Sequence, residues 1–185
     1  VEGAGEEEAQ SQANRIVNRL MQLIKQPVRP AIRAARPLEV DGDLRPEGKQ
    51  GALVRSLDSY RAYYERWAET WEFQALLRAR PIAGSEAQGR AFIELIDPYR
   101  YPREFTAEQA QQVRRMKARV EHERMPHGAD RTRQLKLGRG GLSDVEWLVQ
   151  LIQLQHAHEV EGLRTTSTLE ALNAAVEANL VAAED

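Results

Sequence analysis

The stretch KLGRGGLSDVEWLVQLIQLQHA at positions 136–157 decides the fold class of this chain. A glycine-rich turn leads into a segment whose apolar residues, from Leu148 to Leu154, recur at the spacing of one helix face. Ser143 and Glu146 match the Ser/Thr-x-x-Glu/Gln pattern of a helix start, in which the hydroxyl accepts a hydrogen bond from the third amide. We therefore expect a helix that begins at Ser143 and packs against other helices.

The same start pattern occurs three more times in the chain, which predicts three further helices. It is found at Ser85 with Gln88, at Thr106 with Gln109 and at Ser167 with Glu170. Two more segments have helical spacing of apolar residues: one covers about 6–26, and the other covers about 57–80 with a break near Thr70. These segments predict a mostly α fold in which a helical bundle covers residues 56–185.

The composition excludes several classes of protein. The 185 residues are 42% hydrophobic, and they include no cysteine, which excludes a disulfide scaffold and a cysteine-based zinc module. No apolar run approaches the roughly 20 residues of a membrane helix, and a net charge of -2 gives no general attraction to nucleic acid. We expect a cytoplasmic protein with no membrane or nucleic-acid partner.

Because the chain starts with Val1 and not with methionine, we also expect it to be a piece of a longer protein.

Residues 38–55 lack the helical spacing of apolar residues and show a pattern typical of strands. Short alternating or apolar runs at Leu38–Asp41 and Ala52–Arg55 flank a polar loop, which predicts two strands joined as a hairpin. Two strands alone are marginally stable, and the only other candidate is a weak one at Gln134–Leu137. We expect a two-stranded element within a first domain, residues 1–55, that precedes the helical bundle.

The segment LEVDGDLRPEGKQG at 38–51 is the first that could carry chemistry. Asp41 and Asp43 offer the hard oxygen ligands that magnesium prefers, and Arg45 and Lys49 could hold the phosphates of a nucleotide. This combination would suit phosphoryl or nucleotidyl transfer. The alternative is a hairpin with an exposed acidic edge and an ion pair to Arg45.

The glycine-rich turn at 138–141 is the second candidate, because a helix start after such a turn favours anions. Lys136 and Arg139 would contribute positive charge to a bound substrate or nucleotide. Asp144 and Glu146 would repel phosphate unless a metal lay between them. The alternative is a tight loop followed by a helix cap.

Arg78 and Arg80, near the end of the 57–80 segment, form a third candidate. Either arginine could bind a phosphate or a carboxylate of an active cleft. The alternative is ordinary helix content, since an arginine at a helix end complements the helix dipole.

Several long motifs, taken in order, resemble the glutamine-synthetase adenylyltransferases, which are large bacterial enzymes with two similar nucleotidyltransferase halves. The resemblance covers nearly the whole chain. The composition of the chain, rich in arginine and alanine, resembles that of actinobacterial members. The forms WEFQAL at 71–76, Tyr101–Pro102 and RMPHGAD at 124–130 resemble the C-terminal half, which attaches AMP. The other motifs are EVDGDLRPEGKQG at 39–51, YRAYYERWAETWEFQALLRARPIAG at 60–84, KLGRGGLSDVEWLVQLIQLQHA at 136–157 and LRTTSTLEAL at 163–172.

The resemblance implies a magnesium-dependent reaction in which ATP gives AMP to a tyrosine of glutamine synthetase and pyrophosphate is released. The implied protein partners are glutamine synthetase and the PII signal protein. Residues 1–55 would then be the end of a nucleotidyltransferase α/β domain, and the two strands would be a remnant of its sheet.

The resemblance also assigns individual residues. Asp41 falls on the third metal-binding carboxylate of the family, whereas Asp43 stands where many relatives carry arginine. Asp144 and Glu146 match an acidic pair in the family's Gly-Gly-x-x-Asp-x-Glu segment, and the resemblance implies that they support the wall of the cleft or contact the substrate or nucleotide.

The family's Gly-Ser-x-x-Asp-x-Asp metal-binding pair is missing from this chain, because the nearest string, GSEAQG at 84–89, has no aspartate. We therefore expect the chain to be inactive alone. Two alternatives remain: a non-catalytic helical module that binds PII or glutamine synthetase, and a related PII uridylyltransferase.

Overall fold

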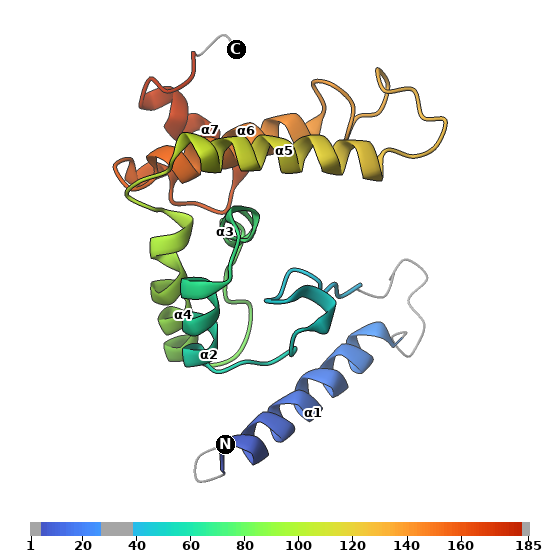
Figure 1. The fold of residues 1–185 in the computed structure, drawn as a ribbon, viewed down its shortest axis with the longest axis vertical. Coiled ribbons are helices and arrows are strands. Elements are labelled where there is room, and N and C mark those ends of the chain that lie inside the picture. Colours follow the sequence, from blue (N-terminus) through green and yellow to red (C-terminus); the bar gives the residue numbers. More distant parts are fainter. Residues whose placement is uncertain (1–4, 27–38, 183–185) are drawn as a thin grey trace. The chain divides into compact units, whose positions relative to one another are not determined.

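The computed structural model describes residues 5–26 and 39–182. Within these two ranges the chain forms seven α helices and two short 3-10 helices, with no strand, so the predicted mostly α class is confirmed (Figure 1). No helix in these ranges is both long and apolar enough to cross a bilayer. The elements are α1 (Glu6–Lys25), η1 (Gly48–Gln50), α2 (Leu57–Arg66), α3 (Thr70–Leu76), α4 (Glu86–Arg100), α5 (Ala107–Arg124), α6 (Leu142–His156), η2 (Glu161–Leu163) and α7 (Thr168–Glu177).

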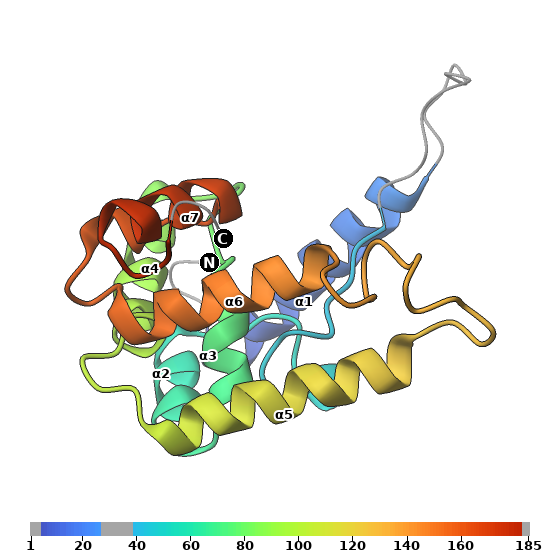
Figure 2. The same cartoon turned by 90° about the horizontal axis from the view of Figure 1, so that it is seen from above.

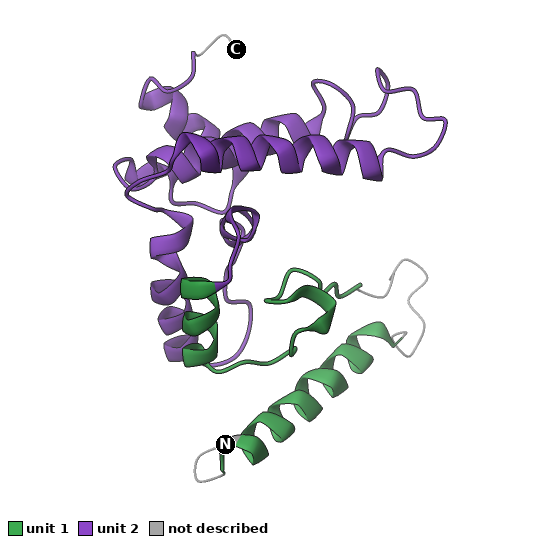
Figure 3. Cartoon of the chain, in the orientation of Figure 1, with its two compact units in different colours: residues 1–66 green, residues 67–185 purple. Residues whose placement is uncertain are grey.

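The chain divides into two compact units, residues 1–66 and 67–185 (Figure 3). The first unit contains α1, η1 and α2, and the second contains α3 to α7. The division by contacts therefore falls after α2, whereas the sequence-based division starts the helical bundle at residue 56. The assignment of these parts to the domains of an enzyme stays a prediction.

The predicted pair of strands is wrong for the residues that the structure describes. Residues 39–41 and 52–55 form no strand, and Leu38 lies outside the described residues. The weak candidate at Gln134–Leu137 is a turn, because the Gln134 side chain accepts hydrogen bonds from the amides of Lys136 (2.7 Å) and Leu137 (3.2 Å).

Arg45 explains how residues 42–51 keep a defined shape without a sheet. Its guanidinium donates to the carbonyl oxygens of Gly42 (2.6 Å), Lys49 (3.0 Å) and Gly51 (2.8 Å). Backbone carbonyls need hydrogen-bond donors, and two short strands alone make a marginal ladder. A single arginine side chain here supplies the donors that a neighbouring strand would supply in a sheet.

Three of the four predicted helix starts are confirmed. The hydroxyls of Ser85, Thr106 and Ser167 accept hydrogen bonds from the backbone amides three residues later. Ser143 is wrong as a cap, because α6 begins at Leu142 and its N-cap is Gly141. The amides of Leu142 and Ser143 bond instead to the carbonyls of residues 135 and 136, so the first turn needs no side-chain cap.

The predicted break near Thr70 is confirmed, since α2 ends at Arg66 and α3 starts at Thr70. A capping box made by Glu69 and Glu72 marks the start of α3, and the Glu69 amide donates to the Glu72 carboxylate at 2.8 Å. Two carboxylates can form such a box because each accepts from the other residue's backbone amide.

The core of the second unit lies where α6 meets α7 and η2, with α3 also in contact with α6 (Figures 1 and 2). Val149, Leu154 and Leu163 are at most 1% exposed. Gln153 is also completely buried, and its amide donates to the carbonyls of Leu163 (2.7 Å) and Thr165 (2.8 Å). Both views show α5 and α6 side by side, with the loop 125–141 joining their ends.

Candidate functional site

Four of the predicted site residues lie on one loop of the first unit. Asp41 accepts a hydrogen bond from the backbone amide of Asp43 at 2.8 Å, which fixes a local turn. Asp43 pairs with Lys49, whose ammonium lies 3.3 Å from one carboxylate oxygen. With Arg45 at the centre of the same loop, the structure brings Asp41, Asp43, Arg45 and Lys49 together, although their predicted chemical roles stay predictions.

The loop is fastened to α2 through Glu47. The Glu47 carboxylate pairs with the guanidinium of Arg55 at 2.5 Å, and its backbone amide donates to the Tyr63 hydroxyl at 3.4 Å. Glu47 has a φ of 63°, a left-handed conformation that costs energy for a residue with a side chain. These contacts hold the strained residue in place and tie the middle of the loop to α2.

The described residues do not complete the magnesium site that the family resemblance implies. They contain no group of three or more His, Cys, Asp or Glu side chains placed to hold a metal ion. Asp41 and Asp43 offer two carboxylates, and the second is paired with Lys49. A magnesium site for transfer to or from ATP needs more oxygen ligands than this loop supplies.

Asp144 forms the centre of the second group of predicted residues, in the second unit. One carboxylate oxygen accepts from the Lys117 ammonium at 2.5 Å, and the other accepts from the Gly140 amide at 2.7 Å. Lys117 also pairs with Glu121 on its own helix. Asp144 therefore joins α6 to α5 and to the glycine-rich turn.

These contacts shift the pKa values of both partners. The hydrogen bond from Lys117, followed by that from Gly140, lowers the pKa of Asp144. Burial alone would lower the pKa of Lys117, but its hydrogen bonds to Asp144 and Glu121 outweigh burial and raise that pKa. Both groups are charged at neutral pH, and the pair acts as a structural clamp between two helices.

The glycines of the turn allow backbone segments to approach closely. A Cβ atom on Gly138 would lie 2.4 Å from the carbonyl oxygens of Arg131 and Gln134, and one on Gly141 would lie 2.7 Å from that of Leu135. Any larger residue would push these segments apart. This close approach explains the glycines at 138 and 141, whereas Gly140 has a φ of 74°, a conformation that favours glycine.

The turn uses its own amide groups, which bears on the predicted anion site. The amides of residues 140–144 all donate within the chain, to the Asp144 carboxylate and to the carbonyls of Gly138, Leu135, Lys136 and Gly141. None of these five donors is left for an anion. A ligand at this place would have to be held by side chains, and Lys136 and Arg139 are exposed there.

The other predicted residues of the second unit do not gather around one point. Arg78 donates to the Thr166 carbonyl and the Thr168 hydroxyl, both at 2.7 Å, and so fastens the end of α3 to the start of α7. Arg80 and Glu146 are exposed, and neither forms a hydrogen bond or an ion pair with another described residue. The binding roles predicted for these three residues stay predictions.

Lys117 is the main residue that reasoning from the sequence missed. Basic and acidic residues alternate along α5, a pattern typical of a solvent-exposed helix face. The only local signal is the four-residue spacing from Lys117 to Glu121. Asp144, the partner from another helix, is 27 residues away in the sequence, where no local pattern reaches it.

Replacing Asp144 by asparagine is expected to destabilise the second unit by about 1–2 kcal/mol at pH 7, because the charged acceptor of Lys117 is lost. The folded-state pKa of Asp144 is lowered, so its contribution is complete above the ordinary value of 3.8 and disappears as the pH falls through the folded-state pKa. Urea unfolding at neutral pH and at successively lower pH measures this difference between wild type and Asp144→Asn.

The matched control is Glu146→Gln, on the same helix turn but without a partner, which should leave the free energy of unfolding unchanged within about 0.5 kcal/mol. A destabilisation by Asp144→Asn that stays constant down to acidic pH would contradict a role for the charged pair.

Comparison with known proteins identifies the family. The family described as glutamate-ammonia ligase adenylyltransferase matches residues 1–95, which is more than half of the 185 residues. The chain belongs to this family. Members of the adenylyltransferase family also match along the rest of the chain, while residues 114–185 match a second family, GlnD PII-uridylyltransferase.

Three of the relatives come from actinobacteria, as the composition rich in arginine and alanine predicted. An enzyme of Streptomyces avermitilis is 55% identical over 185 residues, covering 100% of this chain and 18% of the relative. The enzyme of Streptomyces coelicolor is 54% identical, with 99% of this chain and 18% of the relative covered. That of Mycobacterium marinum is 58% identical, with 80% of this chain and 15% of the relative covered. All three are named bifunctional glutamine synthetase adenylyltransferase/adenylyl-removing enzyme, and the chain spans less than a fifth of their length.

Proposed function

We propose that this chain is part of an enzyme that transfers AMP from ATP to a tyrosine of glutamine synthetase, with magnesium as cofactor. The observation that carries the proposal is the family match over residues 1–95 together with 55% identity to the Streptomyces avermitilis enzyme over the whole chain. The motifs at 71–76 and 124–130 favour the half that attaches AMP over the half that removes it.

The first unit contributes one carboxylate, that of Asp41, to the nucleotidyltransferase site. Arg45 and the contacts of Glu47 hold its loop, which supports a positioned carboxylate. The other metal-binding carboxylates and the bulk of the ATP site come from parts of the enzyme outside this chain. On this proposal the chain alone does not catalyse AMP transfer.

The second unit serves as a helical module that follows the catalytic core in the chain. The match of residues 114–185 to the PII-uridylyltransferase family supports a helical part common to two kinds of nucleotidyltransferase. In a second candidate function, this unit binds a protein partner, PII or glutamine synthetase, without taking part in the chemistry. The name of the matched family supports PII as this partner, and the names of the relatives support glutamine synthetase.

A chimeric enzyme tests the proposal. In the Streptomyces avermitilis enzyme, the segment that matches this chain over 185 residues is replaced by the chain itself. We expect the chimera to transfer radiolabelled AMP from ATP to glutamine synthetase at a rate within about tenfold of the parent, because a 55% identical segment should keep the shape of the site. A chimera that folds, as shown by a cooperative thermal transition, but transfers no AMP would contradict the proposal.

The isolated chain provides the complementary measurement. Calorimetry with ATP and magnesium should show no saturable binding, since the chain supplies only part of the site. Saturable, magnesium-dependent binding that Asp41→Ala abolishes would mean that the chain holds a competent site by itself.

A further inference from the structure

The apolar face of α6 continues past the core at the start of the helix. Positions 142, 145, 149 and 152 follow the spacing of one helix face. Val149 is 1% exposed and Ile152 is 7% exposed, whereas Val145 is 40% exposed and Leu142 is 68% exposed. Leu135, which is 81% exposed, lies beside Leu142 because its carbonyl accepts the Leu142 amide at 2.9 Å. These three side chains form an exposed apolar patch.

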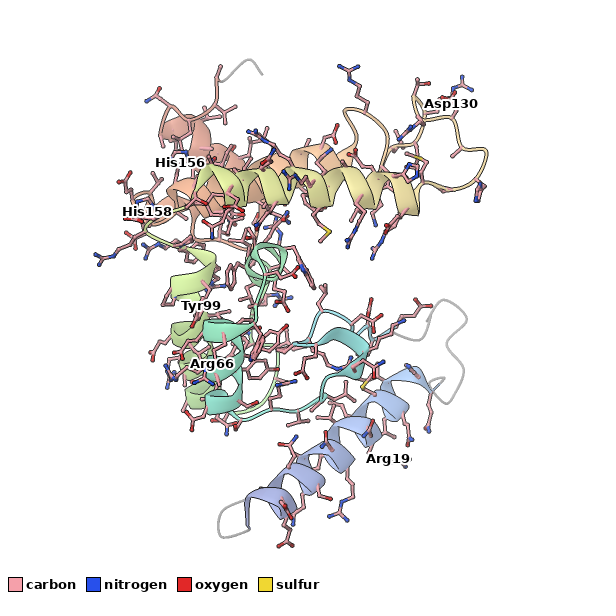
Figure 4. The ribbon with its side chains drawn as sticks, in the orientation of Figure 1. Arg19, Arg66, Tyr99, Asp130, His156 and His158 are labelled. Atoms are coloured by element: carbon pink, nitrogen blue, oxygen red, sulfur yellow. The ribbon has the colours of Figure 1, made fainter. Side chains whose placement is uncertain are left out.

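The loop that leads into this patch is rich in positive charge. Residues 124–139 contain five arginine or lysine residues and one aspartate, in a chain whose net charge is -2. All five basic side chains are exposed, and none forms a hydrogen bond or an ion pair with a described residue. The aspartate, Asp130, is engaged with the amide (2.9 Å) and hydroxyl (2.7 Å) of Thr132. Figure 4 shows Asp130 in this loop, beyond the end of α5.

The end of this loop, residues 135–140, is held against α6, so this part needs little ordering when a partner binds. The carbonyls of Leu135 and Lys136 bond to the first amides of α6 at 2.9 and 3.0 Å. The Asp144 carboxylate holds the Gly140 amide and the Lys117 ammonium. A preorganised surface loses less conformational entropy on binding, which favours affinity.

We propose that Leu135, Leu142 and Val145, together with Arg133, Lys136 and Arg139, form a docking surface for an acidic protein surface that carries an apolar patch. An apolar centre with a charged rim is the usual anatomy of a protein interface, and arginine is enriched there. The inference rests on the proposed function in one respect, since glutamine synthetase is the partner to be tested.

A protein fits this surface better than a polyphosphate or a nucleic acid. The amides at the start of α6 are bonded within the chain, so they cannot cradle a phosphate. Residues 124–142 contain no Phe, Tyr or Trp on which bases could stack. Exposed leucines contribute to binding only when the partner buries them.

The test measures binding of the whole chain to glutamine synthetase from Streptomyces avermitilis by biolayer interferometry. The charge variant is Arg133→Glu/Arg139→Glu, and its matched control is Arg103→Glu/Arg114→Glu, which reverses two exposed arginines elsewhere in the second unit. The apolar variant is Leu135→Ser/Leu142→Ser. Its control is Ile82→Ser/Leu169→Ser, at residues that are 83% and 73% exposed.

We expect both surface variants to weaken binding at least about tenfold and both controls to change it less than about twofold, because few residues dominate an interface. Binding of the wild type should weaken as salt rises, since charges at the rim steer association. Circular dichroism before each measurement excludes variants that fail to fold. If a double variant fails to fold, the milder single variant Arg139→Gln or Leu135→Ala replaces it.

Three outcomes would overturn the docking surface: no binding of glutamine synthetase, equal binding of all variants, and a loss with Arg133→Glu/Arg139→Glu but not with Leu135→Ser/Leu142→Ser. In the last case, competition by magnesium-ATP or by single-stranded DNA would identify a phosphate-bearing ligand instead. The proposed function is measured separately by AMP transfer in the chimera, so its failure and that of the docking surface are distinguishable.

Discussion

In the chimeric enzyme, Asp41→Asn is expected to lower AMP transfer about 100-fold or more while leaving the stability of the protein unchanged. Asparagine keeps the side-chain oxygen that accepts the Asp43 amide, so the local turn is preserved. What it removes is the negative charge. The resemblance places this charge in the catalytic site. A charged group in a catalytic site contributes strongly to the stabilisation of the transition state.

The measurement is the initial rate of AMP transfer to glutamine synthetase at saturating ATP, with the melting temperature recorded for each variant. Asp58→Asn is the control, because Asp58 is an exposed carboxylate in the first turn of α2, outside the loop. An unchanged rate in Asp41→Asn would remove Asp41 from the catalytic site. A lowered rate together with a lowered melting temperature would assign the residue to folding.

Local patterns predicted the helices of this chain well, because the interactions that start a helix lie within a few residues. Ser85, Thr106 and Ser167 each find their amide partner three residues later, so the sequence carries the complete signal. Ser143 has the same local pattern, but the first amides of α6 donate to carbonyls of the preceding loop and not to a side chain. The start of α6 is therefore set by contacts that the pattern does not contain.

The strands were wrong for a related physical reason. Alternation of apolar and polar residues describes which side chains share a face, and it carries no information about a pairing partner. Residues 42–51 find their partner in one side chain, the Arg45 guanidinium. In the sequence, an arginine beside two aspartates indicates an ion pair or a phosphate-binding group. In the structure, the Arg45 guanidinium instead donates hydrogen bonds to three backbone carbonyls.

The candidate site shows the same limit. The sequence placed Asp41, Asp43, Arg45 and Lys49 on one short segment, and the structure brings them together because they are close in the chain. The clamp between Lys117 and Asp144 joins two helices that only tertiary packing brings together. The family resemblance assigned Asp144 to the wall of the cleft or to a substrate contact without indicating this partner. The structure supplies a physical reason for a carboxylate at this position.

Gln153→Met is expected to lower the free energy of unfolding of the second unit by about 2–3 kcal/mol. Gln153 is completely buried, and its amide donates to the carbonyls of Leu163 and Thr165 at 2.7 and 2.8 Å. Methionine fills a similar volume but has no donor, so both carbonyls lose their partner in a site with little access to water. The Gln153 carbonyl oxygen has no hydrogen-bond partner, and its removal offsets part of the loss.

Urea unfolding and hydrogen exchange test this role together. Because the lost bonds tie residues 163–165 to α6, exchange should accelerate first in the segment from η2 to the start of α7. Gln155→Met is the control on the same helix, since Gln155 makes no hydrogen bond with a described residue, and it should change stability by less than about 0.5 kcal/mol. If the two variants were equally stable, the core would be held by apolar packing around Leu163 alone, and the buried amide would be dispensable.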